Sequence, residues 1–280
     1  MSIWGESLRF RSLEIKNRVF RASRAYARGA EAGWSPLDWE LKYARAGVGA
    51  IISARVEVCP AAGSARNGPA IHEDEAIGPW QPWVGRIHAY HCRYLIRLGH
   101  ARVPHGSLAL EDFRGIVQAF AEAGRRARET GADGVEIDGG EGSLIEQYLA
   151  PGVKSDRPAG YQGSLEHRAR LVRQIVRGVR HHVGPDFHVQ VLLGVTSPLG
   201  MMAAGTLRLV EWLQHDGIDA VHIAADAVAA RYLRDTAAIP VVRGGRFETE
   251  AAARAALGDG SCDAVALETR EVATPWRPAA

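Results

Sequence analysis

Eight short apolar runs, separated by longer amphipathic stretches, constrain how this chain folds more than any other feature. The runs have the length of strands and are rich in Val, Ile, Leu and Ala: residues 19–22, 50–53, 94–98, 135–138, 188–193, 220–224, 240–243 and 264–267. Strands that alternate with helices form a parallel sheet, and eight of them in 280 residues are typical of a closed barrel. The sequence therefore predicts a single (β/α)8 TIM barrel that spans residues 1–280.

The stretches between these runs carry the helical signal. Apolar residues recur at helical spacing in residues 110–120, 171–179, 206–215 and 248–257. One long segment, residues 58–82, is rich in Gly, Pro and Ala and is predicted to be irregular. Because it follows the second run, we expect it to form a lid or wall on the active face of the barrel.

Charge and cysteine content exclude several classes of function. The net charge of +2 is small and the basic residues are spread along the chain, which argues against nucleic-acid binding. No apolar run is long enough to span a membrane, and the N-terminus lacks the pattern of a secretion signal. Cys59, Cys92 and Cys262 form no CxxC pair, so neither a disulfide framework nor a metal site is predicted. We expect a cytoplasmic protein with a small-molecule substrate, either monomeric or a homo-oligomer.

The block around the fourth run is the most specific motif in the chain. It reads Gly131-Ala-Asp-Gly-Val-Glu-Ile-Asp-Gly-Gly-Glu-Gly-Ser-Leu144, and Gln147-Tyr-Leu-Ala-Pro151 follows it. With Ile15-Lys-Asn-Arg18 before it and Pro240-Val-Val-Arg-Gly-Gly245 after it, the chain resembles the old yellow enzyme family of NADH:flavin oxidoreductases. The resemblance spans nearly the whole chain. It implies a barrel of the FMN-dependent ene-reductase type, in which a nicotinamide supplies hydride to the flavin.

The residues that contact the flavin in this family are replaced here. The small residue beneath the flavin aligns with Arg55, and the Gln at its pyrimidine edge aligns with Arg97. The Arg of the fifth strand aligns with Leu192, and the Gly-Arg pair that holds the phosphate aligns with Glu268-Thr269. A guanidinium only donates hydrogen bonds, whereas the Gln amide also accepts them. We therefore expect that the FMN site is lost and that the protein needs no cofactor.

The substrate-contacting positions of the family have changed as well. Its His-x-x-His/Asn pair has become Asp138-x-x-Glu141, and its proton-donating Tyr aligns with Ser143. Two close carboxylates raise each other's pKa and a neighbouring Arg lowers it, so one acid and one base can coexist. Asp138 and Glu141 are therefore the predicted catalytic residues. The structural alternative is that they pair with Arg side chains or cap a helix.

Other polar residues at or near strand ends are predicted to bind the substrate, because strand ends converge at the C-terminal mouth of a barrel. A buried guanidinium stays charged and needs a carboxylate or an anionic ligand. Two alternatives stay open: Arg–carboxylate pairs that fill an emptied flavin pocket, and an Arg21 that points outward. The predicted substrate-binding residues are Arg21, Arg55, Arg97, His100, Ser143 and His222.

These residues predict a flavin-independent, redox-neutral acid/base enzyme of the isomerase, lyase or cyclase type. Its substrate would be a polar or anionic small molecule, for example in the biosynthesis of a specialised metabolite. The first alternative is a divergent FMN-dependent NAD(P)H ene-reductase in which Gly244, Gly245 and Arg270 still hold the phosphate. The second is a catalytically inactive barrel that binds a ligand or a partner protein.

Overall fold

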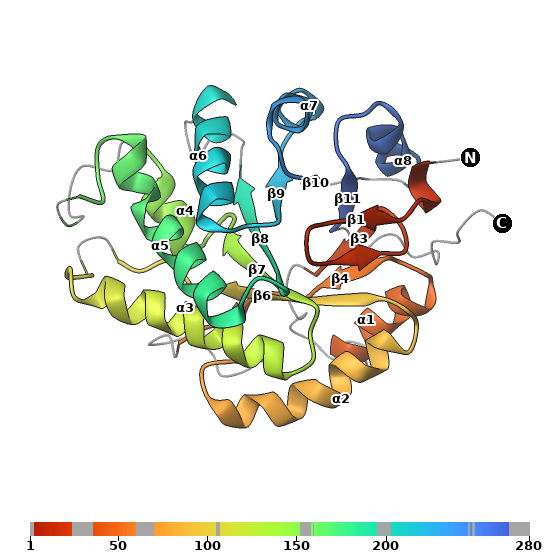
Figure 1. Ribbon diagram of the computed structural model, residues 1–280, viewed down its shortest axis with the longest axis horizontal. Coiled ribbons are helices and arrows are strands. Elements are labelled where there is room, and N and C mark those ends of the chain that lie inside the picture. The colour runs from red at the N-terminus through yellow and green to blue at the C-terminus, as the bar shows by residue number, and fades with distance from the viewer. Residues whose placement is uncertain are drawn as a thin grey trace.

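Eight parallel strands close into a barrel in the computed structural model, which describes residues 3–23, 36–59, 70–104, 107–151, 158, 160–194, 203–245, 247 and 250–268 (Figure 1). The ring closes because the first barrel strand pairs with both the second and the last. A short strand, β5 (Val56–Glu57), extends the edge beside β6. In chain order the barrel strands are β3 (Val19–Ala22), β4 (Ala50–Ile52), β6 (Arg93–Gly99), β7 (Gly134–Gly139), β8 (His188–Gly194), β9 (Ala220–Ala224), β10 (Val241–Gly244) and β11 (Ala264–Leu267). The predicted (β/α)8 barrel is confirmed.

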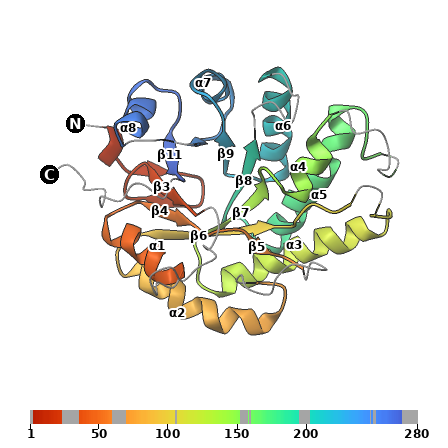
Figure 2. The same cartoon turned by 180° about the vertical axis from the view of Figure 1, so that it is seen from behind.

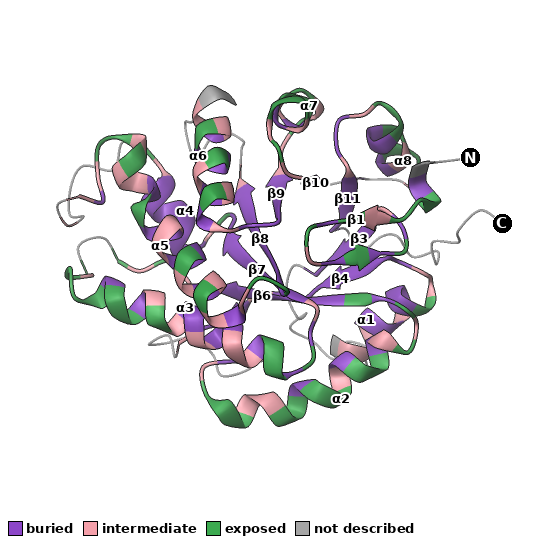
Figure 3. Cartoon of the chain, in the orientation of Figure 1, coloured by how far each residue is buried: buried purple, intermediate pink, exposed green. Residues whose placement is uncertain are grey.

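Helices surround the barrel on its outside, as the two opposite views show (Figures 1 and 2). Their outer faces are exposed and the strands are buried (Figure 3). No helix within the described ranges is long and apolar enough to cross a membrane. The helices are α1 (Pro36–Arg45), α2 (Ile77–His88), α3 (Asp112–Glu129), α4 (Leu144–Leu149), α5 (Leu165–Val183), α6 (Ala203–Asp216), α7 (Ala227–Thr236) and α8 (Glu250–Gly258), with 3-10 turns η1 (Ile3–Gly5) and η2 (Asp74–Ala76).

The predicted irregular segment 58–82 is wrong at its C-terminal end. Residues 74–76 form η2, and α2 begins at Ile77. Trp80, Val84 and Ile87 are buried on one face of α2, which is the spacing of an amphipathic helix. The Gly and Pro residues of this stretch hid that periodicity, and tertiary packing outweighed their low helix propensity. Residues 60–69 lie outside the described residues.

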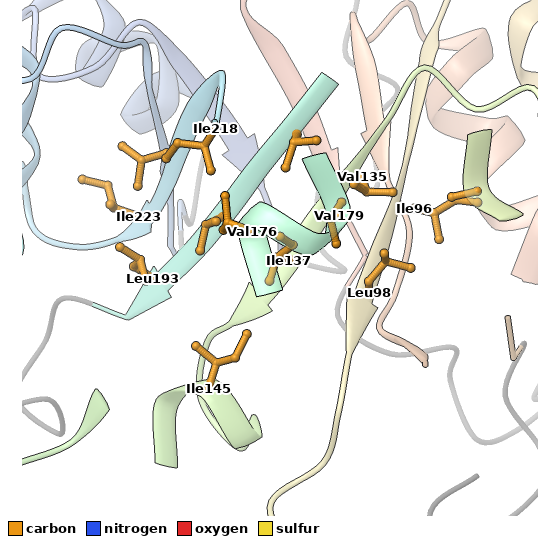
Figure 4. Packing of buried hydrophobic residues seen from close by; sticks show 14 of the residues in the cluster. Ile96, Leu98, Val135, Ile137, Ile145, Val176, Val179, Leu193, Ile218 and Ile223 are labelled. Carbon is orange, nitrogen blue, oxygen red and sulfur yellow. The ribbon is translucent and has the colours of Figure 1, made fainter. Parts of the chain in front are cut away.

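Two apolar cores surround the strands. The outer core lies between the strands and the helices, where Val135 and Ile137 of β7 face Val176 and Val179 of α5 (Figure 4). The inner core fills the N-terminal half of the barrel and continues into the hairpin of β1 (Leu8–Arg9) and β2 (Glu14–Ile15). Phe10 of this hairpin packs edge-on against Phe20, with ring centroids 6.2 Å apart. The hairpin therefore closes the N-terminal end, and the polar inward-facing residues lie toward the C-terminal end.

Candidate active site

A layer of polar side chains lies inside the barrel above its apolar core. Arg97, Glu136, Gln190 and His222 come from the four neighbouring strands β6, β7, β8 and β9. Glu136 is fully buried at the centre of this layer. Its carboxylate accepts hydrogen bonds from Arg97 Nε at 2.6 Å, Gln190 Nε2 at 2.6 Å and His222 Nδ1 at 2.7 Å. Because an ionised carboxylate only accepts hydrogen bonds, Nδ1 of His222 carries a proton.

The electrostatics of this layer keep its central ion pair charged. Burial alone would raise the pKa of Glu136, but the Arg97 guanidinium and the hydrogen bonds from His222 and Gln190 hold it at about 2. Burial alone would lower the pKa of Arg97, but the neighbouring carboxylates of Glu136 and Asp138 raise it. Glu136 and Arg97 therefore form a buried salt bridge at neutral pH. Gln190 and His222 donate further hydrogen bonds to the Glu136 carboxylate.

Two atoms of this layer have no hydrogen-bond partner among the described residues. They are Arg97 Nη2 and His222 Nε2, and both are buried. The His222 ring lies against β10 at Gly244, where an added Cβ would be only 2.3 Å from Nε2. Gly244 is therefore required for the ring to occupy this position. Buried polar atoms without partners are costly, so both atoms call for a partner that the described residues do not supply.

Arg55 and Asp138 lie closer to the mouth of the barrel. Asp138 is the penultimate residue of β7, and its Oδ1 accepts a hydrogen bond from Gly140 N at 3.0 Å. Its Oδ2 is 3.8 Å from Arg55 Nη1, whereas Arg55 Nε is 3.0 Å from Glu57 Oε1. The aliphatic part of Arg55 crosses Gly99 of β6, where an added Cβ would come within 2.3 Å of Arg55 Cδ. Arg55 therefore covers a carboxyl group whose own side chain is only 8% exposed.

Burial dominates the ionisation of Asp138. Desolvation raises the pKa of this carboxyl above its ordinary value, although Arg97, the Gly140 N–H and Arg55 act in the opposite direction. Asp138 therefore differs from Glu136, whose direct ion pair with Arg97 lowers its pKa. The described residues contain no group of three or more His, Cys, Asp or Glu side chains that could hold a metal ion.

The other predicted site residues lie apart from this layer. Arg21 is on the outward side of β3 beneath α1, with its guanidinium 4.4 Å from the centre of the Tyr43 ring, so its expected place in the mouth is wrong. Glu141 is exposed on the loop after β7. His100 Nδ1 lies 2.7 Å from the carbonyl oxygen of Ala101. Ser143 is fully buried and caps α4, since its Oγ accepts a hydrogen bond from Glu146 N.

Sequence reasoning missed the residue at the centre of the layer. Glu136 stands two positions before Asp138, and on a strand this spacing places both side chains on the same face. Gln190 is two positions before Leu192 on the next strand and could have been found in the same way. The predicted strand ended before Gly244, whereas β10 ends at Gly244, and Gly245 follows it with a φ of +132°. Arg270 lies outside the described residues.

Comparison with known proteins settles the family. The sequence profile of the NADH:flavin oxidoreductase / NADH oxidase family matches residues 6–106 and 101–275. The chain belongs to this family. The resemblance to old yellow enzymes inferred from the fourth-strand block is thereby confirmed, and NADH:flavin oxidoreductases are its relatives along nearly the whole length.

Several curated members of the NADH:flavin oxidoreductase family are similar in sequence. A 12-oxophytodienoate reductase-like protein of Arabidopsis thaliana is 32% identical over 168 residues, which cover 49% of this chain and 52% of that protein. NADPH dehydrogenase of Bacillus licheniformis is 31% identical over 118 residues, 42% of this chain and 34% of that protein. The chain thus matches about half or less of their lengths. NADPH dehydrogenase of Geobacillus thermodenitrificans is 24% identical over 96% of this chain and 90% of its own length.

Solved structures share the same fold. Morphinone reductase in complex with tetrahydroNAD superposes with a TM-score of 0.82 at 24% identity, over 97% of this chain and 88% of that chain. A 2-naphthoyl-CoA reductase complex superposes with a TM-score of 0.85 at 16% identity, over 98% of this chain and 51% of that chain. At these identities the likeness describes the fold, which is the barrel of Figure 1.

Family membership corrects two expectations from the sequence. The expectation of a flavin-independent, redox-neutral isomerase, lyase or cyclase is wrong, because the chain belongs to a family of NADH:flavin oxidoreductases and its relatives are reductases and dehydrogenases. The expectation that no cofactor is needed is wrong for the same reason. Both expectations were based on the replaced flavin-contacting residues and gave less weight to the family resemblance along the rest of the chain. An altered contact can be compensated from a neighbouring strand while the framework persists.

The residues of the mouth can be tested against the FMN that the family implies. Arg97 Nη2 is a buried donor without a partner among the described residues, and the pyrimidine edge of a flavin carries carbonyl acceptors. Gly245 leaves open space at the end of β10, since no described atom lies within 4 Å of an added Cβ. Arg55 is larger than the small residue of the family, and its side chain is 31% exposed. One donor, Arg97 Nη2, therefore matches the hydrogen-bonding chemistry of the pyrimidine edge of FMN.

Proposed function

We propose that this protein is an FMN-dependent oxidoreductase that uses NADH or NADPH to reduce an activated carbon–carbon double bond in a small molecule. The observation that carries the proposal is the pair of buried atoms without partners, Arg97 Nη2 and His222 Nε2, in the barrel of an NADH:flavin oxidoreductase. The names of the relatives, NADPH dehydrogenase and 12-oxophytodienoate reductase, support the same chemistry.

Bound FMN would supply hydride transfer, and the residues of this chain would hold the cofactor and the substrate. Arg97 is the residue we assign to the pyrimidine edge, because its guanidinium is anchored by Glu136 and still has a donor to spare. A fixed cation next to an electron-rich group stabilises it without further reorganisation. Gly245 is assigned to the phosphate end, because no described atom lies within 4 Å of an added Cβ there and a glycine lets the backbone approach the ligand closely.

Asp138 is the residue we assign to substrate contact and proton transfer, with the proton at Oδ2. Its Oδ1 is occupied by the Gly140 N–H, and burial raises the pKa of the carboxyl so that it can hold a proton more readily than an exposed Asp. Ser143, at the position of the family's proton donor, is engaged as the cap of α4. Arg55 lies over Asp138, so a substrate must displace this side chain or bind to it.

The direct test of this function is cofactor content. We expect the purified full-length protein to show the visible absorption of an oxidised flavin, or to acquire it with one FMN per chain on reconstitution. NADH or NADPH should bleach that absorption without oxygen, and a cyclic enone should restore it. A protein that takes up no FMN, or whose reduced flavin is not reoxidised by any activated alkene, would contradict the proposal.

Variants of Arg97 test the assignment of the pyrimidine edge. Arg97→Gln restores the residue that the family resemblance implies and should retain FMN. Arg97→Leu removes the donor and should weaken FMN binding by about tenfold to a hundredfold, the usual effect of losing a hydrogen bond to a charged group. Arg173→Leu is the control, because this guanidinium pairs with Asp216 at 2.6 Å on the helical layer. Equal FMN affinity in all three variants would remove Arg97 from the site.

We also propose that the protein works in the cytoplasm. Cys59, Cys92 and Cys262 are free thiols, which fits a reducing compartment. Burial raises the pKa of Cys92 and Cys262, so both stay protonated and unreactive. Fractionation of cells that express the full chain tests this point, and recovery with a secreted or periplasmic marker would refute it.

A further inference from the structure

Glu40 of α1 is a buried carboxyl group that the proposed chemistry does not use. It is only 1% exposed, and three side chains from three other parts of the fold donate hydrogen bonds to it. Ser23 Oγ lies 3.1 Å from Oε1, while Trp83 Nε1 and Tyr94 OH lie 3.0 Å and 2.7 Å from Oε2. Glu40 therefore joins α1 to the end of β3, to α2 and to β6.

Ser23 connects this carboxyl group to the polar layer inside the barrel. Its backbone N–H bonds to the carbonyl of Ile52 at 2.9 Å, which continues the pairing of β3 with β4. Its hydroxyl faces outward to Glu40, and its carbonyl accepts a hydrogen bond from Arg97 Nη1 at 3.1 Å. The bonds run without interruption from Glu40 through Ser23 and Arg97 to Glu136. Every side chain in this series is buried.

The groups that face Glu40 determine when it ionises. Burial raises the pKa of Glu40 to about 7, against the hydrogen bonds from Tyr94, Trp83 and Ser23 and the charge of Arg21. Arg21 projects from β3 and Tyr43 is on α1 itself, with the guanidinium over the ring. Cys92 precedes β6, and burial raises the pKa of its thiol, so that it stays neutral. Glu40 thus changes its charge near neutral pH while its neighbours keep theirs.

We infer that Glu40 is a positioning residue of the active site, which controls through Ser23 where the Arg97 guanidinium lies, and that proton binding at Glu40 relaxes this control. The ionised carboxylate accepts all three hydrogen bonds. A protonated carboxyl has one O–H that must itself donate, so the hydrogen bond to one of the two hydroxyl partners, Ser23 or Tyr94, has to reverse its direction or break. Ser23 is the donor that can do so most readily, because its hydroxyl is on a single rotatable bond, whereas the Tyr94 and Trp83 groups are on large packed rings. The role in FMN binding rests on the proposed function, but the coupling between Glu40 and Arg97 does not.

Side-chain N–H resonances in proton–nitrogen correlation spectra of the full-length protein test this coupling without any cofactor. The Trp83 indole N–H reports on Glu40, and the Arg97 Nε–H reports on the polar layer. Trp83→Phe and Arg97→Lys identify the two signals. Between about pH 5 and about pH 9 we expect both resonances to move with one common midpoint near neutral pH. The Nε–H of Arg173, which bonds to Asp216 at 2.6 Å on the helical layer, is the internal control and should not follow that midpoint.

Two variants separate the steps of the proposal. Glu40→Gln keeps the shape of the side chain but cannot ionise, so neither resonance should titrate near neutral pH. Ser23→Ala keeps the carbonyl but removes the hydroxyl, so Trp83 should still titrate while Arg97 no longer follows. An Arg97 resonance that stays fixed in the wild-type protein while Trp83 titrates would overturn the coupling. A fixed Trp83 resonance would overturn Glu40 as the proton-binding group. Failure of the protein to bind FMN would contradict the proposed function alone, because these spectra are recorded without the cofactor.

Discussion

Replacing Glu136 by Gln should destabilise the fold more than any other single change of a carboxylate described above. The pKa of Glu136 lies at about 2 instead of its ordinary 4.5, and a shift of this size corresponds to about 3 kcal/mol of stabilisation at neutral pH. Removing one partner of a buried ion pair typically costs about 3–5 kcal/mol, because the other charge stays buried. Glu136→Gln leaves the Arg97 guanidinium buried without its partner, so we expect the free energy of unfolding to fall by about 3–5 kcal/mol at pH 7.

Urea unfolding followed by circular dichroism measures this loss. A carboxyl group with a lowered pKa stabilises the fold fully above its unfolded pKa, and this contribution disappears as the pH falls through the folded pKa. The difference between wild type and Glu136→Gln should therefore be constant down to about pH 4.5 and shrink toward about pH 2. Glu250→Gln is the control, because Glu250 pairs with Arg254 at the surface of α8, and exposed pairs contribute under about 1 kcal/mol.

A second substitution distinguishes the charge argument from simple loss of packing. In Glu136→Gln combined with Arg97→Met the unpaired cation is gone, and part of the lost stability should return, because apolar side chains often replace buried ion pairs without a large loss. If Glu136→Gln loses no more than the surface control, or if the double variant is less stable than the single one, the reasoning about this ion pair is wrong.

Three further predictions concern sterics, pH and catalysis. Gly244→Ala should cost about 1–3 kcal/mol in urea unfolding because the new Cβ would lie 2.3 Å from His222 Nε2, whereas Gly85→Ala, on an open face of α2, should be neutral or stabilising. The unfolding free energy of wild type relative to Glu40→Gln should fall by about 3 kcal/mol as the pH rises from about 4.5 to about 7, because the folded state holds the Glu40 proton longer than the unfolded state. Asp138→Asn should keep FMN but lower enone reduction by about 10²–10⁴-fold, and Glu141→Gln should stay near wild type; equal turnover in both would make Asp138 structural.

The strand pattern of the sequence was sufficient to determine the fold. The predicted ranges 19–22, 220–224 and 264–267 coincide with β3, β9 and β11, and the other five strands differ from theirs by one residue at one or both ends. Short β-branched runs and helical periodicity are local properties of the chain, so they can be recognised without knowledge of the tertiary contacts between helices and strands. The residues of the fourth-strand block likewise identified the family.

The sequence also placed Arg55, Arg97, Asp138 and His222 toward the C-terminal end of the barrel, because alternation along a strand fixes which side chains point inward. The sequence did not identify the hydrogen-bond partners of these residues. Glu136 of β7 holds Arg97 of β6 and His222 of β9 together, and such a contact depends on the register of the barrel rather than on spacing along the chain.

Only the tertiary structure decided which polar residues gather inside the barrel. Arg21 and Arg97 both lie within strands, yet the pleat turns Arg21 outward beneath α1 and Arg97 inward to Glu136. Ser143 is engaged as a helix cap by the chain that follows it. The replaced flavin contacts, taken together, indicated a lost cofactor, and the family match along the chain overturned that expectation. The barrel brings side chains from several strands to one point, and their partners depend on its register.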